Sequence, residues 1–470
     1  MSAKLPRIKS DYSTPARLKR WFFLLIPTRI SVFIFRKFID DDRERNSIEA
    51  AKFLVDTNNI YPTRFYFLLG KFLRFSLALA DAKLPKAYVH QITKSLSKTR
   101  RKPFLRKKMC EQILHSTAEL DVRQTSAHGW KLVSLGLSGL GFIRAGTIAR
   151  NYCLSAALIE ISQGLASNRT THLAIKGLLE SRQFDEARNL IESFAKRVDP
   201  ISLDETYGDY LSLMKQPRPN LSRLAAKTFD QNDELFSRLV KDKRVAIVAP
   251  GVINKEYGHE IDSHDTVLRI KFNGRSAMPD EKLVGRRCDI TSHNSDLLTL
   301  AKTDSLNLGS IFLEATDIKM LIAKKGNFKV VGGIPVREMS SWAPTFLTTA
   351  TSGTLMIYEV LREKPKMASL FGYDFYTNRQ IYNQELLSTY RQSSNPDGAD
   401  SREHSWNGDF FSVSSVARSH ISHDLKSDFL LVKNLYELSG LIDGAPEVLE
   451  ILNLTADEYD MRLEEMLGDW

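Results

Sequence analysis

The sequence has few cysteines and no long apolar run, and each absence excludes a class of protein. Its three cysteines, Cys110, Cys153 and Cys288, lie far apart and have no metal-ligand spacing. A sparse, odd count suits a reducing compartment better than a disulfide framework. The most apolar N-terminal stretch, residues 21–35, contains a proline and an arginine and is shorter than the roughly 20 apolar residues of a spanning helix. No small-residue cleavage site follows it, so we do not expect a removed signal peptide.

The rest of the composition describes a multidomain protein whose basic charge is local. A chain of 470 residues is too long for one compact core, and 43% hydrophobic residues can fill two or three. Residues 1–110 hold 25 Lys and Arg against 8 Asp and Glu, whereas the remainder holds 41 against 48. The net charge of +10 is therefore a property of the N-terminal quarter, for which nucleic acid and anionic membrane are both candidate partners.

The aromatic pattern of residues 1–110 fits acidic lipid headgroups or an anionic polysaccharide as well as RNA, and the lack of a nucleic-acid reading fold decides against nucleic acid. Trp21 and several phenylalanines, with basic residues on both sides, suit a helix that lies in a membrane interface. Phenylalanines alternate with Lys and Arg through residues 60–110, but no recognisable nucleic-acid reading fold is present. The alternatives are an amphipathic helix packed on the protein and a solvated basic face. We expect a region peripheral to an anionic membrane and no nucleic-acid partner.

Residues 111–235 predict a helical domain. Its clearest unit is 171–194, where one helix is expected to end near Ser181 and a second to begin at Phe184. The pair resembles a helical-hairpin repeat of the tetratricopeptide type, in which Gly177 and Ala187 would permit close helix approach. Such a domain could be a scaffold for a partner or acceptor, or a plain helical domain.

The pattern changes at Arg244, and residues 240–440 predict an α/β domain with a largely parallel sheet. Short apolar runs alternate there with helical stretches such as Thr354–Arg362. Residues 441–470 predict a helical tail, with one or two acidic helices over Glu447–Leu467. The expected strands include Val245–Val248, Thr266–Ile270, Ile311–Leu313, Lys329–Val331 and Ser369–Phe371.

Three local patterns in this domain could carry chemistry. The strand at 245–248 stops at a Pro/Gly turn ending in Gly251, and such turns bind ligands in open α/β sheets. The Ser352-Gly353-Thr354 turn opens an apolar helix, whose N-terminus offers N–H groups and a hydroxyl to a phosphate. His423 precedes a helix with Asp428 five residues on, an arrangement suited to a general base.

In this order, the patterns resemble the sialylmotifs of the eukaryotic-type sialyltransferases over about residues 240–440. His404 lies where the short third motif has its histidine, and His423 with Asp428 resembles the very small motif, which normally has Glu in place of this Asp. The matching stretches are 258–269 and 285–293 for the large motif, and Ser352-Gly353-Thr354 with Gly372-Tyr373 for the small motif.

The resemblance implies a Rossmann-like, GT-A-variant domain that transfers a sugar from a CMP donor with inversion and needs no metal or other cofactor. His423 would deprotonate the acceptor hydroxyl and His404 would sit near the donor phosphate. The expected donor-binding residues are Gly251, Asn273, Ser352, Gly353, Thr354 and Tyr373. Sialic acid and Kdo are both activated as CMP sugars, so either is an expected donor.

Some positions depart from the family pattern. Ala249-Pro250 stand where the family has Gly-Asn, and Lys271 stands where it has Asn, with Asn273 nearby. Cys288 has no later cysteine partner, so the disulfide of luminal members cannot form. These features indicate a cytoplasmic, bacterial relative at the inner membrane face that acts on a surface glycan, such as a capsule or lipopolysaccharide. The alternative is a helical-repeat adaptor with a degenerate, non-catalytic transferase domain.

Overall fold

The computed structural model of the chain describes residues 84–85, 87–92, 106–221, 231–272, 280–293, 318–323, 330–331, 333–339, 343–377 and 423–466. The predicted membrane-interface stretch and the predicted strand at 311–313 lie outside these residues. Among the described helices, none is long and apolar enough to cross a membrane.

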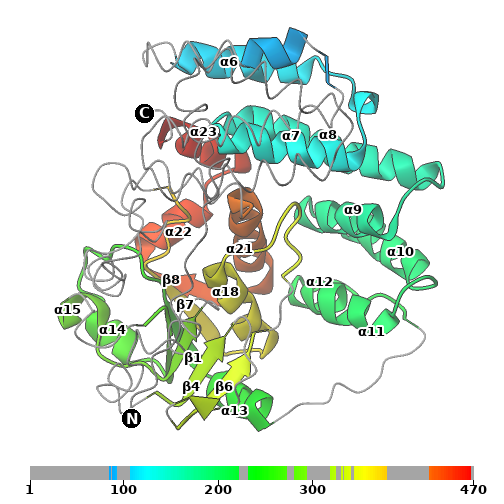
Figure 1. Ribbon diagram of the computed structural model, residues 1–470. Helices are drawn as coiled ribbons and strands as arrows, with labels where there is room; N and C mark the ends of the chain where they lie inside the picture. The colour runs from blue at the N-terminus through cyan, green and yellow to red at the C-terminus, as the bar shows by residue number, and fades with distance from the viewer. Residues whose placement is uncertain are drawn as a thin grey trace, which may run out of the picture. The chain divides into compact units, whose positions relative to one another are not determined.

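Helices alone make up the described chain before residue 244, as predicted (Figure 1). They include a long antiparallel pair, α7 and α8, followed by shorter helices and a π-helical segment, η3. Their bounds are α6 Arg106–Ala118, η2 Val122–Gln124, α7 Ala127–Gly139, α8 Ile143–Ser162, α9 Asn168–Glu180, α10 Phe184–Phe194, α11 Pro200–Leu203, η3 Asp204–Gly208, α12 Asp209–Leu213 and α13 Gln231–Val240.

The predicted hairpin is confirmed by α9 and α10. Ser167 caps α9 by accepting a hydrogen bond of 3.1 Å from the N–H of Thr170. Gly177 lies where a side chain would not fit, because a Cβ there would approach Leu154 Cδ1 to 2.8 Å and the Phe346 ring to 3.0 Å. The glycine thus allows α9 to contact both α8 and a loop of the α/β part.

The second part of the chain is a Rossmann-like α/β fold, which confirms the predicted class. The sheet has strand order β5-β6-β4-β3-β2-β1-β7-β8. All neighbouring strands are parallel except the β5–β6 pair. The strands are β1 Arg244–Val248, β2 Thr266–Ile270, β3 Ile290–His293, β4 Met320–Ala323, β5 Val330–Val331, β6 Ile334–Glu338, β7 Met367–Phe371 and β8 Ile442–Gly444.

In the described residues, helices lie between β1 and β2, between β2 and β3, between β6 and β7, and between β7 and β8. Two of them matter most for the site: α18 precedes β7 and α21 precedes β8, so each runs antiparallel to the strand that follows it (Figure 1). The helices of this part are α14 Gly258–Asp262, α15 Glu281–Val284, α18 Ser352–Arg362, α21 Leu425–Ser439, α22 Pro446–Leu452 and α23 Ala456–Met466.

The buried residues form two hydrophobic clusters, and one loop of the α/β part belongs to the helical cluster. The larger cluster surrounds the sheet and includes side chains of α9, α10 and α12. The smaller cluster is centred on α7 and α8, and it contains Phe346 and Leu347 from the loop before α18. Both side chains are at most 3% exposed. The helical region therefore packs directly against the segment that leads into α18.

Candidate functional site

The sheet has a topological switch point between β1 and β7. From β1 the chain continues outward through β2, β3, β4 and β6, and it then returns to the other side of β1 to form β7. Open α/β sheets bind ligands in the crevice outside the carboxyl ends of the strands at such a point. Gly251 follows β1 and Tyr373 follows β7, so both predicted donor residues lie at this edge.

The turns after β1 and β7 contact each other through their backbones. The N–H of Ala249 donates to Phe371 O at 2.8 Å, which extends the ladder beyond the strands. A Cβ on Gly251 would lie 2.1 Å from Gly372 O, and Gly372 itself has a φ of +69°. Gly251 is therefore needed for the close approach of the two turns, whatever it contributes to a ligand.

Gly251→Ala should lower the free energy of unfolding by about 1–3 kcal/mol, because the new methyl group must push a backbone carbonyl aside. It should also weaken binding at this edge. Gly164→Ala is the comparison: Gly164 has a φ of +71° and nothing lies within 4 Å of its Cβ position, so it reports the strain of a left-handed alanine without a steric contact. Urea unfolding measures both variants. A loss below about 0.5 kcal/mol in Gly251→Ala would mean that the two turns separate without cost.

The N-terminus of α18 forms the second part of the site. Thr351 is its N-cap, and its hydroxyl accepts a 3.4 Å bond from Thr354 N–H. Thr354 is buried within this cap, whereas Ser352 and Gly353 lie half-buried in the first turn. Tyr373 OH donates to Gly353 O at 3.4 Å, so the turn lies against the residue that follows β7. The fold thus brings four of the six predicted donor residues, Ser352 to Thr354 and Tyr373, close together.

His423 lies beside this turn. It forms a parallel β-bridge with Thr349, and its Nδ1 is 3.1 Å from Thr349 O. A carbonyl oxygen only accepts, so Nδ1 carries a hydrogen, and in the neutral imidazole Nε2 carries the lone pair. This tautomer is the one that a general base requires, with the ring oriented by the backbone of the segment that leads into α18.

Asp428 joins the helix that follows His423 to the same turn. Both of its carboxylate oxygens accept from Thr351 N–H, at 3.2 and 3.1 Å. The side chain is 3% exposed, and burial raises its pKa to about 8 despite the hydrogen bonds from Thr351, with a further upward contribution from Asp424. Asp428 is therefore a buried tie between α21 and the α18 turn.

Three polar side chains of the large-motif stretch, His264, Asp262 and Arg269, have structural partners. His264 donates from Nδ1 to Glu260 O and accepts at Nε2 from the Ser369 hydroxyl, both at 2.9 Å. Asp262 accepts from two backbone N–H groups that follow α15, at 2.8 and 3.0 Å. Arg269 is buried and donates to two carbonyls next to that turn. This stretch frames the end of β1 through a network of backbone contacts.

Two predicted site residues, Asn273 and His404, lie outside the described residues. The sequence prediction did not identify Thr351 as a helix cap, although a threonine before an apolar helix is a recognised N-cap signal. It also gave no role to Arg150, which lies in α8 about 270 positions before α21. No local pattern marks a single arginine inside a helix as part of a distant site.

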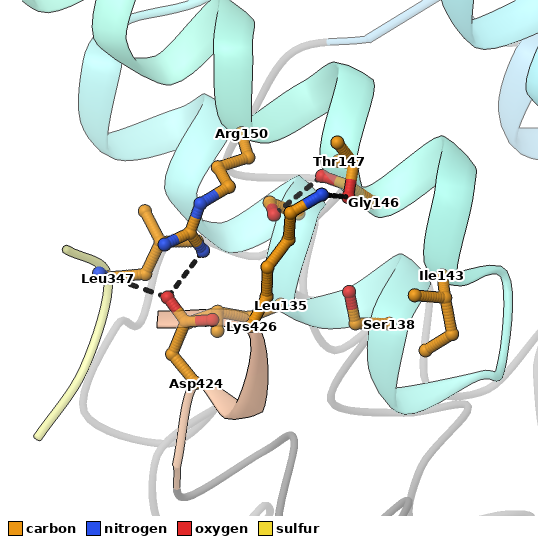
Figure 2. A pocket seen from close by; sticks show the side chains of 10 residues that line it. Leu135, Ser138, Ile143, Gly146, Thr147, Arg150, Leu347, Asp424 and Lys426 are labelled. Carbon is orange, nitrogen blue, oxygen red and sulfur yellow. Dashed lines mark hydrogen bonds and ion pairs between the residues drawn. The ribbon is translucent and has the colours of Figure 1, made fainter. Parts of the chain in front are cut away.

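Near this site, α7 and α8 border a small cavity with room for about one water molecule (Figure 2). Arg150, Asp424 and Lys426 line it, together with Leu347 from the loop before α18 (Figure 2). It is too small for a nucleotide. In the described part of the chain, no group of three or more His, Cys, Asp or Glu side chains is arranged to hold a metal ion.

Comparison of this chain with protein-family models and with curated proteins finds no match in either case. Any functional conclusion therefore depends on the geometry described above and on the sialylmotif resemblance.

Proposed function

We propose that the protein is an inverting glycosyltransferase that moves sialic acid or a related ulosonic acid from a CMP-sugar to a hydroxyl of a surface glycan. The observation that carries the proposal is the meeting of three features at the switch point. They are the capped N-terminus of α18, Tyr373 after β7, and His423 beside Thr349. A phosphate-binding helix end next to a correctly oriented imidazole suits transfer from a nucleotide-activated donor.

The first turn of α18 would bind the phosphate of the donor. The first N–H groups of a helix have no partner within the helix, and the macrodipole favours an anion there. Ser352 and Gly353 supply these groups, and the Ser352 side chain adds a hydroxyl. When the bond between the sugar and CMP breaks, the phosphate leaves as an anion, so these donors stabilise the charge that develops.

His423 would act on the acceptor. As the acceptor oxygen attacks the anomeric carbon, Nε2 takes the hydroxyl proton, a glycosidic bond forms and CMP departs with the bonding electrons. The Nδ1–H bond to Thr349 O holds the tautomer in which Nε2 can accept that proton. Attack on the face opposite to CMP inverts the anomeric carbon.

The charge of residues 1–110 supports the proposed cellular setting. Their excess of Lys and Arg would hold the enzyme at an anionic membrane surface, on the cytoplasmic side, where a lipid-linked glycan acceptor is available. The helical region would then lie close to acceptor or to other assembly enzymes.

Calorimetric titration of the full chain with CMP tests the proposal, followed by mass-spectrometric transfer assays with CMP-sialic acid and CMP-Kdo. We expect saturable CMP binding at the micromolar level and transfer from at least one donor. AMP serves as the control, because a simple phosphate site would bind both nucleotides equally. A chain without CMP affinity would contradict the enzyme proposal and favour the helical-repeat adaptor.

A further inference from the structure

Helix α8 sends a buried arginine into the start of α21. Arg150 is 4% exposed, and its guanidinium pairs with Asp424 and donates to the Ser427 hydroxyl. On its other side it binds Glu180 of α9 through two bonds, one of them from Nε at 2.7 Å. Figure 2 shows Arg150 and Asp424 pointing toward each other, from a helix and a segment that are far apart in sequence.

The two residues that Arg150 fixes on α21 also hold the loop before α18. Asp424 caps α21 by accepting from Ser427 N–H at 3.2 Å, and it accepts from Leu347 N–H at 3.2 Å. Ser427 Oγ accepts from Phe346 N–H at 2.9 Å. The orientation of the His423 ring depends on its own backbone and on Thr349 O. The first is next to Asp424, which pairs with Arg150. The second lies in the loop that Asp424 and Ser427 hold, so Arg150 reaches both segments through one or two contacts.

This network is ionic rather than neutral. Burial alone would raise the pKa of Asp424, but Arg150 and the hydrogen bonds from Ser427 outweigh it and hold that pKa below the ordinary value. The guanidinium also lies 4.8 Å over the Phe346 ring. A planar fork with four hydrogen bonds to three residues, Glu180, Asp424 and Ser427, and a ring contact fixes its neighbours in a way that a lysine cannot reproduce.

We propose that Arg150 is a positioning residue for His423: from the helical region it orders Asp424, Ser427 and the 346–349 loop, and thereby sets the orientation of the His423 ring. The consequence for catalysis depends on the proposed function of His423 as the base. The consequence for the ring itself does not, so the two can be tested separately.

The variants Arg150→Lys and Ser427→Ala test the proposal. Arg150→Lys keeps the charge and removes the fork. Ser427→Ala keeps every charge and removes the hydroxyl that joins Arg150, Glu180 and the Phe346 N–H, so it is informative even where the arginine variant folds poorly.

The matched control is Arg337→Lys. Arg337 is also about 5% exposed, pairs with two carboxylates (Asp233 at 2.8 Å and Glu359 at 2.9 Å), and lies 4.4 Å over the Phe236 ring. It is on β6, and its partner Glu359 lies in the C-terminal half of α18, about two turns from the Thr351 cap. A purely structural effect of changing a buried arginine should therefore appear equally in this control.

The first measurement is nitrogen-15 NMR of imidazole-labelled full chain near pH 8, with the His423 signals assigned by their loss in His423→Ala. Wild type should show the Nδ1–H tautomer. Both test variants should shift His423 toward the Nε2–H form that predominates in unconstrained histidine, whereas Arg337→Lys should leave it unchanged. The second measurement is transfer: kcat should fall about 10–100-fold in the test variants, while the donor KM changes less than about twofold.

The outcomes separate the two proposals. A tautomer shift without any CMP binding by wild type would support the role of Arg150 and contradict the glycosyltransferase. Test variants that behave like Arg337→Lys in both measurements would overturn the role of Arg150 and leave the glycosyltransferase proposal intact. An Nε2–H tautomer in wild type would overturn the role of Arg150 and also the assignment of Nε2 as the base, and CMP binding and transfer would then still test the glycosyltransferase by themselves.

Discussion

His423→Ala should lower the rate of sugar transfer by about 10²–10⁴-fold, the usual contribution of a positioned general base. The imidazole is oriented for this role by its 3.1 Å bond from Nδ1 to Thr349 O. The affinity for CMP should stay within about twofold of wild type, because the proposed phosphate contacts come from the first turn of α18. Steady-state transfer kinetics and CMP calorimetry on the same preparation measure the two effects.

His115→Ala is the control for removal of a histidine. His115 is an exposed residue of α6 that pairs with Glu119 at 3.1 Å, so its loss should change neither transfer nor binding. Wild-type turnover in His423→Ala would remove this residue from the mechanism. A joint loss of transfer and CMP affinity would instead mean that His423 belongs to the donor site.

The sequence predicted those elements whose signals are local. The apolar run after Arg244 and the stretch Thr266–Ile270 are strands in the structure. The α9–α10 hairpin turns between Glu180 and Phe184 as the composition indicates. In these elements, the pattern of apolar residues and the turn chemistry agree with the tertiary environment.

Local sequence patterns do not predict several of the strands. These segments are strands because they pair with neighbours in the sheet, and their composition does not indicate it. β8 is a three-residue strand, Ile442–Gly444, within a tail that predicts only helices, and it is set by its register against β7. β6 contains Pro335, which argues against a strand in sequence. β5 supplies the short antiparallel partner at that position.

The features of the candidate site also fall into two groups, those that a local sequence signal predicts and those that it does not. Ser352 to Thr354, Gly251 and His423 carry recognisable local signals, a helix start, a strand-ending turn and a histidine before a helix. The hydrogen bonds and ion pairs that join these residues carry no local sequence signal. Asp428 reaches Thr351, and Arg150 reaches Asp424, only because α8, α18 and α21 converge in the fold. A single sequence contains no periodicity that reports such convergence.

Asp428→Asn should remove a large pH dependence of stability. Burial raises the pKa of Asp428 from 3.8 to about 8 in the folded chain. Between these values the unfolded chain releases the proton while the folded chain keeps it, so the free energy of unfolding falls as the pH rises. At about 1.4 kcal/mol for each unit of pKa difference, the contribution lost by pH 8 is roughly 5 kcal/mol. Asparagine has no proton to lose and can still accept from Thr351 N–H.

The difference in stability between wild type and Asp428→Asn should therefore change with pH in one direction. Wild type should be favoured most near pH 4, and its advantage should shrink steadily up to about pH 8. Urea unfolding across this range measures the difference, and Asp457→Asn, which removes an exposed carboxylate from the first turn of α23, is the control for loss of a surface charge. A constant difference would mean that Asp428 titrates normally and that water reaches it. A wild-type advantage that grows with pH would mean that the carboxylate, and not the neutral acid, holds the α18 turn. The link between α21 and that turn would then be a charge-assisted hydrogen bond from a neutral N–H to a carboxylate.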